Sequence, residues 1–188
     1  AGTAQAAGDA APAIVINEVH YDPRSKAAGE YVELYNAGGS AVNLTGWSLG
    51  KGIDYVFPVG AQLLPGSYAL IARNPSALRQ LYGVAALGQF AGRLSNDGEE
   101  LALYDRGGQL IDEVDYVLGF PWPTPDDDAD QSISLINAAL DNSIPGAWRS
   151  GAPTPGRANS SLVANPAPFV DAVSHSPAAP RSTDTVTI

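Results

Sequence analysis

Glycine and proline divide this chain into segments too short for long helices. Its 188 residues include 20 glycines and 15 prolines, and turn signals such as Gly38-Gly39, Pro65-Gly66 and Gly107-Gly108 separate the more apolar runs. Those runs are short and rich in β-branched and aromatic residues, as strands joined by tight turns are. The spacing of the turns predicts an all-β fold, a sandwich or barrel in which most connections are short enough for antiparallel neighbours.

Strands are expected wherever a run of alternating or β-branched residues lies between two turn signals. Gly46 interrupts one such run, so a bulge or kink is expected there. The last strand of the core is expected at residues 132–136. The strands predicted in this way cover residues 14–21, 30–36, 41–44, 47–49, 54–57, 67–72, 100–105, 109–116 and 132–136.

One short helix is predicted over residues 76–82. Asn74 can cap its start, Pro75 suits its first turn and Gly83 suits its exit. We expect the helix to close one end of the sandwich without taking part in catalysis. The residues expected on its packing side are Leu78, Leu81 and Tyr82.

The composition along the chain predicts four regions. Residues 1–13 are small and polar, which is typical of a disordered mature start after removal of a signal peptide. Residues 14–159 are expected to form one domain, followed by a linker at 160–168. Residues 169–188 are predicted to begin a second β module. Its strand at 184–188 could pair with a free sheet edge, so an edge-strand dimer is an alternative to the monomer that we otherwise expect.

Charge and cysteine content exclude several classes of function. The formal net charge is −10, and residues 97–130 hold eleven acidic residues and one base, Arg106. Because this surface repels phosphate backbones, nucleic acid is excluded as a partner, and basic surfaces or cations are favoured. Cysteine is absent, so neither disulfides nor thiolate metal sites can form. No apolar run predicts a membrane helix, so we expect no membrane insertion by this segment.

Five short motifs, in this order, resemble the lamin tail domain family in its bacterial secreted form. They begin with Ile16-Asn17-Glu18 and end with Trp148 and the run at 155–159, so the resemblance spans residues 14–159. It implies an immunoglobulin-like β-sandwich that is exported and attached to a larger protein. The segment 167–188 resembles the start of the immunoglobulin- or fibronectin-like module that often follows. The signature residues to which the resemblance gives a structural role are Asn17, Glu18, Glu30, Glu33, Asn36, Gly46, Trp47, Trp148, Pro155, Gly156 and Asn159.

An acidic loop is the strongest candidate for a metal site. Asp126, Asp128 and Asp130 have the alternating spacing of a calcium loop, in which every second carboxylate points at the cation. An EF-hand is excluded, because Gln131 stands where its glycine is needed and Asn137 where its glutamate is needed. An irregular calcium site and a solvated acidic loop are the two remaining interpretations.

A second group of acidic residues invites an acid–base interpretation. Glu18, His20 and Asp22 alternate along one strand or its exit, and with Glu30 and Glu33 nearby they could imitate a metal or an acid–base cluster. Buried carboxylates must be hydrogen-bonded, so Glu18 and Glu33 are expected to accept from loop amides or from tyrosine and tryptophan donors. A glycosidase-like pair of carboxylates is the alternative.

Three tryptophans could pack in the core or bind a sugar. Trp47 and Trp148 belong to the signature and are expected to be buried. Trp122 lies between two prolines and beside Phe120, so these two aromatic residues are the candidate ligand platform. Packing of Trp122 over the end of the sandwich is the alternative.

These features together predict a non-catalytic interaction or structural module of an exported, multi-domain bacterial protein that requires no cofactor. Its partners would be other protein domains or components of a cell surface. The alternative function is a calcium- or carbohydrate-binding module that serves an attached hydrolase.

Overall fold

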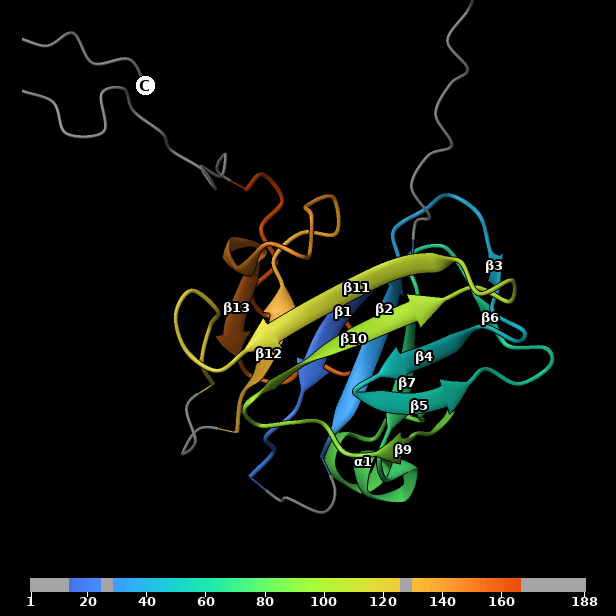
Figure 1. Ribbon diagram of the computed structural model, residues 1–188, viewed down its shortest axis with the longest axis horizontal. Helices are drawn as coiled ribbons and strands as arrows, with labels where there is room; N and C mark the ends of the chain where they lie inside the picture. The colour runs from blue at the N-terminus through green and yellow to red at the C-terminus, as the bar shows by residue number, and fades with distance from the viewer. Residues whose placement is uncertain (1–13, 25–28, 126–129, 167–188) are drawn as a thin grey trace, which may run out of the picture.

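A computed structural model describes residues 14–24, 29–125 and 130–166 of the chain. Two main sheets face each other across an apolar core and form an antiparallel, immunoglobulin-like β-sandwich with one short helix (Figure 1). The predicted fold class is therefore confirmed. The regions predicted at 1–13 and at 169–188 lie outside the described residues.

The six-stranded sheet joins strands from both ends of the domain. β1 is its centre and pairs antiparallel with both β2 and β12, while β8 pairs parallel with β7. The β1–β2 register shifts between Ile16 and Glu18, which marks a bulge at Asn17. In sheet order the strands are β13 (Trp148–Gly151), β12 (Ser132–Leu135), β1 (Ile14–His20), β2 (Tyr31–Asn36), β7 (Tyr68–Ala72) and β8 (Gly88–Gln89).

The five-stranded sheet is built on a long hairpin. β11 pairs with β10 over nearly its whole length, and on its other side no described strand pairs with it. In sheet order the strands are β11 (Leu110–Val117), β10 (Gly98–Tyr104), β4 (Ser48–Lys51), β5 (Ile53–Val56) and β9 (Ala91–Gly92).

A small third sheet explains the role of Gly46. It pairs β3 (Val42–Asn43) with β6 (Gln62–Leu63), whereas β4 belongs to the five-stranded sheet. Gly46 lies between β3 and β4 and has φ 75°, a left-handed conformation that favours glycine. The predicted kink at Gly46 is therefore the point where the chain changes sheets.

The helix α1 (Pro75–Tyr82) forms with the predicted caps. The Asn74 side chain accepts from Ala77 N at 3.1 Å, and Gly83 ends the helix with φ 73°. Leu78 is fully buried against the sheet, but Leu81 is 51% exposed. The prediction that Leu81 packs inward is wrong, because so short a helix buries only a narrow stripe. No described helix is both long and apolar enough to cross a membrane.

The prediction that residues 132–136 are the last core strand is also wrong. β13 follows it and pairs with β12 as the outer strand of the six-stranded sheet. Trp148 in β13 is fully buried in the same core cluster as Ile133 and Leu135 of β12. Contacts with the sandwich continue beyond, since Val163 N donates to Ile136 O at 2.8 Å.

Candidate functional site

Four of the signature residues meet in a buried polar cluster on the six-stranded sheet, which consists of Asn17, Glu18, Glu33, Ser132, Thr154 and Asn159. The exposed Gly156 donates to this cluster through its main-chain N–H. Val32 and Leu34 of β2 point into the apolar core, so Glu33 between them points away from the opposite sheet. β1 and β2 set Glu18 directly opposite Glu33. The chain at 154–159 lies over this face and supplies hydrogen-bond donors.

Both carboxylates of this cluster are fully buried and bound by the chain itself. Glu18 accepts from Ser132 Oγ at 2.5 Å, Thr154 N at 2.9 Å and Thr154 Oγ1 at 3.1 Å. Glu33 accepts from Gly156 N at 2.6 Å and from Asn17 Nδ2 at 2.9 Å. The loop amides expected for Glu18 and Glu33 are thus Thr154 N and Gly156 N, and no solvent-open carboxylate pair results.

Burial controls the protonation of these two groups. It raises the pKa of Glu18, against the hydrogen bonds that favour its charged form. It also raises the pKa of Glu33 to about 8, with a further contribution from the negative charge of Glu18. At neutral pH the Glu33 carboxyl therefore holds its proton in the folded protein.

Asn159 fastens the end of the domain to the sheet. Its Nδ2 donates to Leu135 O at 2.8 Å and to Asn17 Oδ1 at 3.0 Å. In return Asn17 Nδ2 donates to Asn159 Oδ1 at 3.0 Å. The side chain at the Asn17 bulge is therefore hydrogen-bonded to a residue 142 positions further along the chain.

The other signature residues also make internal contacts. Glu30 accepts from Arg73 Nη1 at 2.6 Å and from Leu94 N at 3.0 Å. Asn36 Nδ2 donates to Ser40 O and to Leu63 O, both at 2.9 Å. Trp148 is fully buried and donates through Nε1 to Asn142 O at 2.7 Å. Trp47 is partly buried and packs against the core, Pro155 is buried, and Gly156 has φ 77°.

The acidic loop is described only in part. Asp126 and Asp128 lie outside the described residues. Asp130 Oδ1 accepts from Arg24 N at 2.8 Å and lies 3.4 Å from Nε2 of His20, whose pKa is lowered by burial. Within the described ranges, no three His, Cys, Asp or Glu residues gather to hold a metal ion. Calcium binding by this loop stays a prediction.

The candidate aromatic platform is not a continuous exposed surface. Trp122 is only 7% exposed, because its ring packs against Trp148 with 6.0 Å between ring centroids. Exposure of Trp122 as a sugar platform is therefore contradicted, and its packing over the sandwich is what the structure has. Of the two candidate residues, Phe120 is the exposed one, at 97%.

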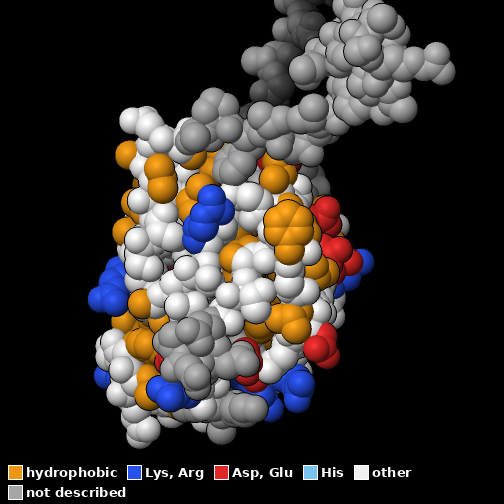
Figure 2. Space-filling view, turned by 90° about the vertical axis from the view of Figure 1, so that its left-hand side faces the viewer, with side chains coloured by type: hydrophobic (Ala, Val, Ile, Leu, Met, Phe, Trp, Pro, Cys, Tyr) orange, Lys and Arg blue, Asp and Glu red, His pale blue; other side chains and the backbone are white. Residues whose placement is uncertain are grey.

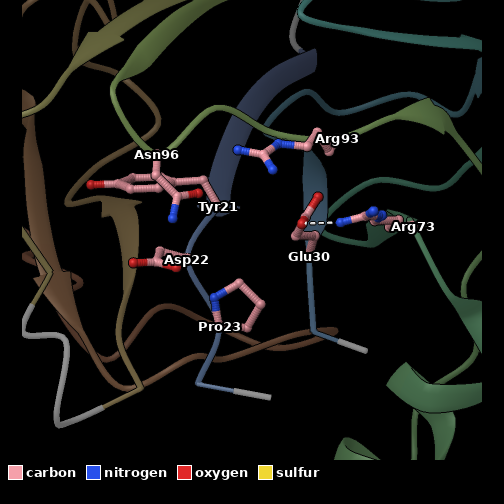
Figure 3. Close-up of a pocket in the computed structure, with 7 residues that line it drawn as sticks. All are labelled: Tyr21, Asp22, Pro23, Glu30, Arg73, Arg93 and Asn96. Carbon is pink, nitrogen blue, oxygen red and sulfur yellow. Dashed lines mark hydrogen bonds and ion pairs between the residues drawn. The ribbon is translucent and has the colours of Figure 1, made fainter. Parts of the chain in front are cut away.

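A small polar pocket of about 190 Å³ lies where β1, β2 and the chain before β10 meet (Figure 3). Arg73 and Glu30 form an ion pair on one side of it, at 2.6 Å. Asp22 and Asn96 lie on the other side, and Arg93 reaches in above them. Since both oxygens of Glu30 are already hydrogen-bonded, it is poorly placed to act as a general base.

The family model for the Lamin Tail Domain matches residues 7–118. The chain belongs to the lamin tail domain family. The predicted resemblance is confirmed, and the immunoglobulin-like sandwich is the family's fold, that of a non-catalytic module. The match ends after β11, yet β12, β13 and Asn159 complete the sheet of this lamin tail domain. No curated protein matches the chain.

Sequence reasoning did not foresee the open side of β11 as a specific surface. The side chains of Val117, Leu118 and Phe120 are exposed to 43%, 53% and 97% at the end of this strand. We call these three residues the apolar corner. In the sequence, the apolar corner is marked by apolar residues that continue past the end of β11 into the segment 119–125, without the alternating polar residues of a strand.

Proposed function

We propose that this lamin tail domain is a non-catalytic interaction module of an exported, multi-domain bacterial protein, used in adhesion, anchoring or presentation of a neighbouring domain. The observation that carries the proposal is the apolar corner. Phe120 alone is 97% exposed, and such a side chain beside other exposed apolar groups is typical of a contact surface.

The buried polar cluster supports the non-catalytic part of the proposal. An acid–base pair must reach a substrate, whereas Glu18 and Glu33 are fully buried and bind the domain's own amides. The family carboxylates are therefore best explained as anchors for the end of the domain. The exported setting rests on the resemblance to bacterial secreted forms.

Site-specific photo-cross-linking tests this function. A photoreactive phenylalanine analogue at position 120 of the natural full-length protein, in the cell that makes it, is expected to form one defined adduct with another domain or surface component. Val59 is the matched control, because it is 92% exposed and lies between β5 and β6, on the opposite side of the sandwich from the end of β11 (Figure 1). Equal adduct patterns at positions 120 and 59 would contradict the proposal.

A further inference from the structure

The free side of β11 presents main-chain groups that its own sheet does not use. Gly52 N donates to Glu100 O at 2.9 Å, so the polar main-chain groups of Glu100 face away from β11. Main-chain direction alternates along a strand, so Leu101 faces β11 and bonds its partner Val114. The main-chain N–H and C=O groups of Asp115, the residue after Val114, therefore point outward from the free edge of the sheet. Those of Val117 point the same way.

The structure blocks one end of this edge and leaves the other open. Asp112 turns toward β1, where its carboxylate accepts from Ile16 N at 2.6 Å and from Asn142 Nδ2 at 2.7 Å. The same carboxylate accepts from Glu113 N, the first outward N–H of this half of the strand. The main-chain N–H and C=O groups of Asp115 and Val117 have no such partner among the described residues.

The charge beside the open stretch selects the kind of strand that can pair with it. Glu113 and Asp115 are exposed on the outer face of β11, and Asp115 lies opposite Glu100 of β10. Lys51 Nζ already pairs with the Glu100 carboxylate at 3.5 Å, whereas neither Glu113 nor Asp115 has an ion-pair partner among the described residues. Like charges close together destabilise a sheet, so a cation placed beside Glu113 and Asp115 would offset their repulsion. β11 itself contains no lysine or arginine.

Apolar contact is available at the same place. The apolar corner follows the open stretch directly, since Val117 ends β11 and Leu118 and Phe120 come next. Figure 2 views this side of the molecule and shows hydrophobic side chains exposed across it, with acidic side chains along its right-hand edge. An incoming strand would thus meet main-chain groups, negative charge and apolar surface together.

We infer that the edge of β11 at Asp115 and Val117 binds an extended strand of another protein in which basic and apolar residues alternate. Main-chain hydrogen bonds would add this strand to the five-stranded sheet, and its basic side chains would face Glu113 and Asp115. This inference rests on the proposed function and names the partner chemistry of its surface.

The test uses two short synthetic peptides, one alternating lysine and valine and the other alternating glutamate and valine. The lysine peptide is expected to bind the full chain and to slow hydrogen exchange at the Asp115 and Val117 amides. Reversing both exposed charges, with Glu113→Lys and Asp115→Lys, is expected to exchange the preference, weakening the lysine peptide about tenfold and favouring the glutamate peptide.

A proline variant separates strand pairing from simple charge attraction. Val117→Pro removes an outward N–H while keeping every acidic side chain, and an edge strand tolerates proline there. It is expected to weaken the lysine peptide several-fold while leaving the melting temperature close to that of the wild type. Should the proline disturb folding, hydrogen exchange at the Asp115 and Val117 amides of the wild-type chain makes the same separation, because charge attraction alone would leave these amides unprotected.

Two results would overturn the inference. One is no binding of the lysine peptide at millimolar concentration. The other is binding without protection of the two amides, which would leave only charge attraction. If either result occurs while position 120 still forms a defined cross-link, strand addition is refuted but the proposed function is not. Loss of that cross-link would refute the proposed function itself.

Discussion

A chain that ends at Asp130 is expected to be unfolded, although it contains the whole of the family match at 7–118. The cut removes β12 and β13, and with them the buried side chains of Ile133, Leu135 and Trp148. Each such side chain contributes about 1.5–3 kcal/mol through burial, and a whole domain is stable by only about 5–15 kcal/mol. The cut also removes Thr154 and Gly156, so Glu18 and Glu33 lose these hydrogen-bond donors together with the segment that covers them.

Far-UV circular dichroism and thermal melting check this expectation. The matched control is a chain that ends after residue 166, which retains Asn159 and the bond from Val163 N to Ile136 O. The longer chain is expected to melt cooperatively at the temperature of the full chain, and the shorter one to show no transition. A cooperative melt of the shorter chain would mean that β12 and β13 are additions to a domain complete without them.

The free energy of unfolding is expected to fall as the pH rises from 7 to 9, because of Glu33. Its pKa is about 8 in the folded protein, against an ordinary value of 4.5. Between these values the folded state holds a proton that the unfolded state has released, so raising the pH favours unfolding. This stabilisation is complete below the unfolded pKa and is lost as the pH passes the folded one, with a slope of up to about 1.4 kcal/mol per pH unit.

Urea denaturation at several pH values measures this slope. Above pH 7 the effect is separable from that of Asp112, whose pKa is raised to about 6, and from that of His20, whose lowered pKa acts in the opposite direction at lower pH. Glu33→Gln is expected to be less stable at pH 7 but nearly independent of pH, and Glu113→Gln on the exposed face to keep the wild-type slope. A flat wild-type profile from pH 7 to 9 would contradict the account.

Local patterns in the sequence predicted most of the fold, because each strand of a hairpin carries its own alternation and its own turn. The segments at 100–105 and 109–116 became β10 and β11, and the helix formed between Asn74 and Gly83. β13 was missed, since Trp148–Gly151 has no alternation of its own and becomes a strand only by pairing with β12. The burial of Trp122 likewise depends on a distant residue, Trp148.

The candidate site was predictable in kind but not in its partners. Buried carboxylates need donors, so hydrogen-bonded Glu18 and Glu33 followed from general chemistry. Which donors bind them did not, because Thr154 lies 136 positions from Glu18 and Gly156 lies 123 positions from Glu33. The free edge of β11 could not be read from local patterns either, because strand order in a sheet is set by tertiary contacts.

Native-state hydrogen exchange at the amides of Thr154 and Gly156 tests most directly whether the family carboxylates are internal anchors. If Glu18 and Glu33 hold these amides, both are expected to exchange only through global unfolding, as slowly as the central amides of β1 and β2. Exchange at the rate of exposed loop amides would contradict the account. It would mean that the chain at 154–159 opens and uncovers the two carboxylates.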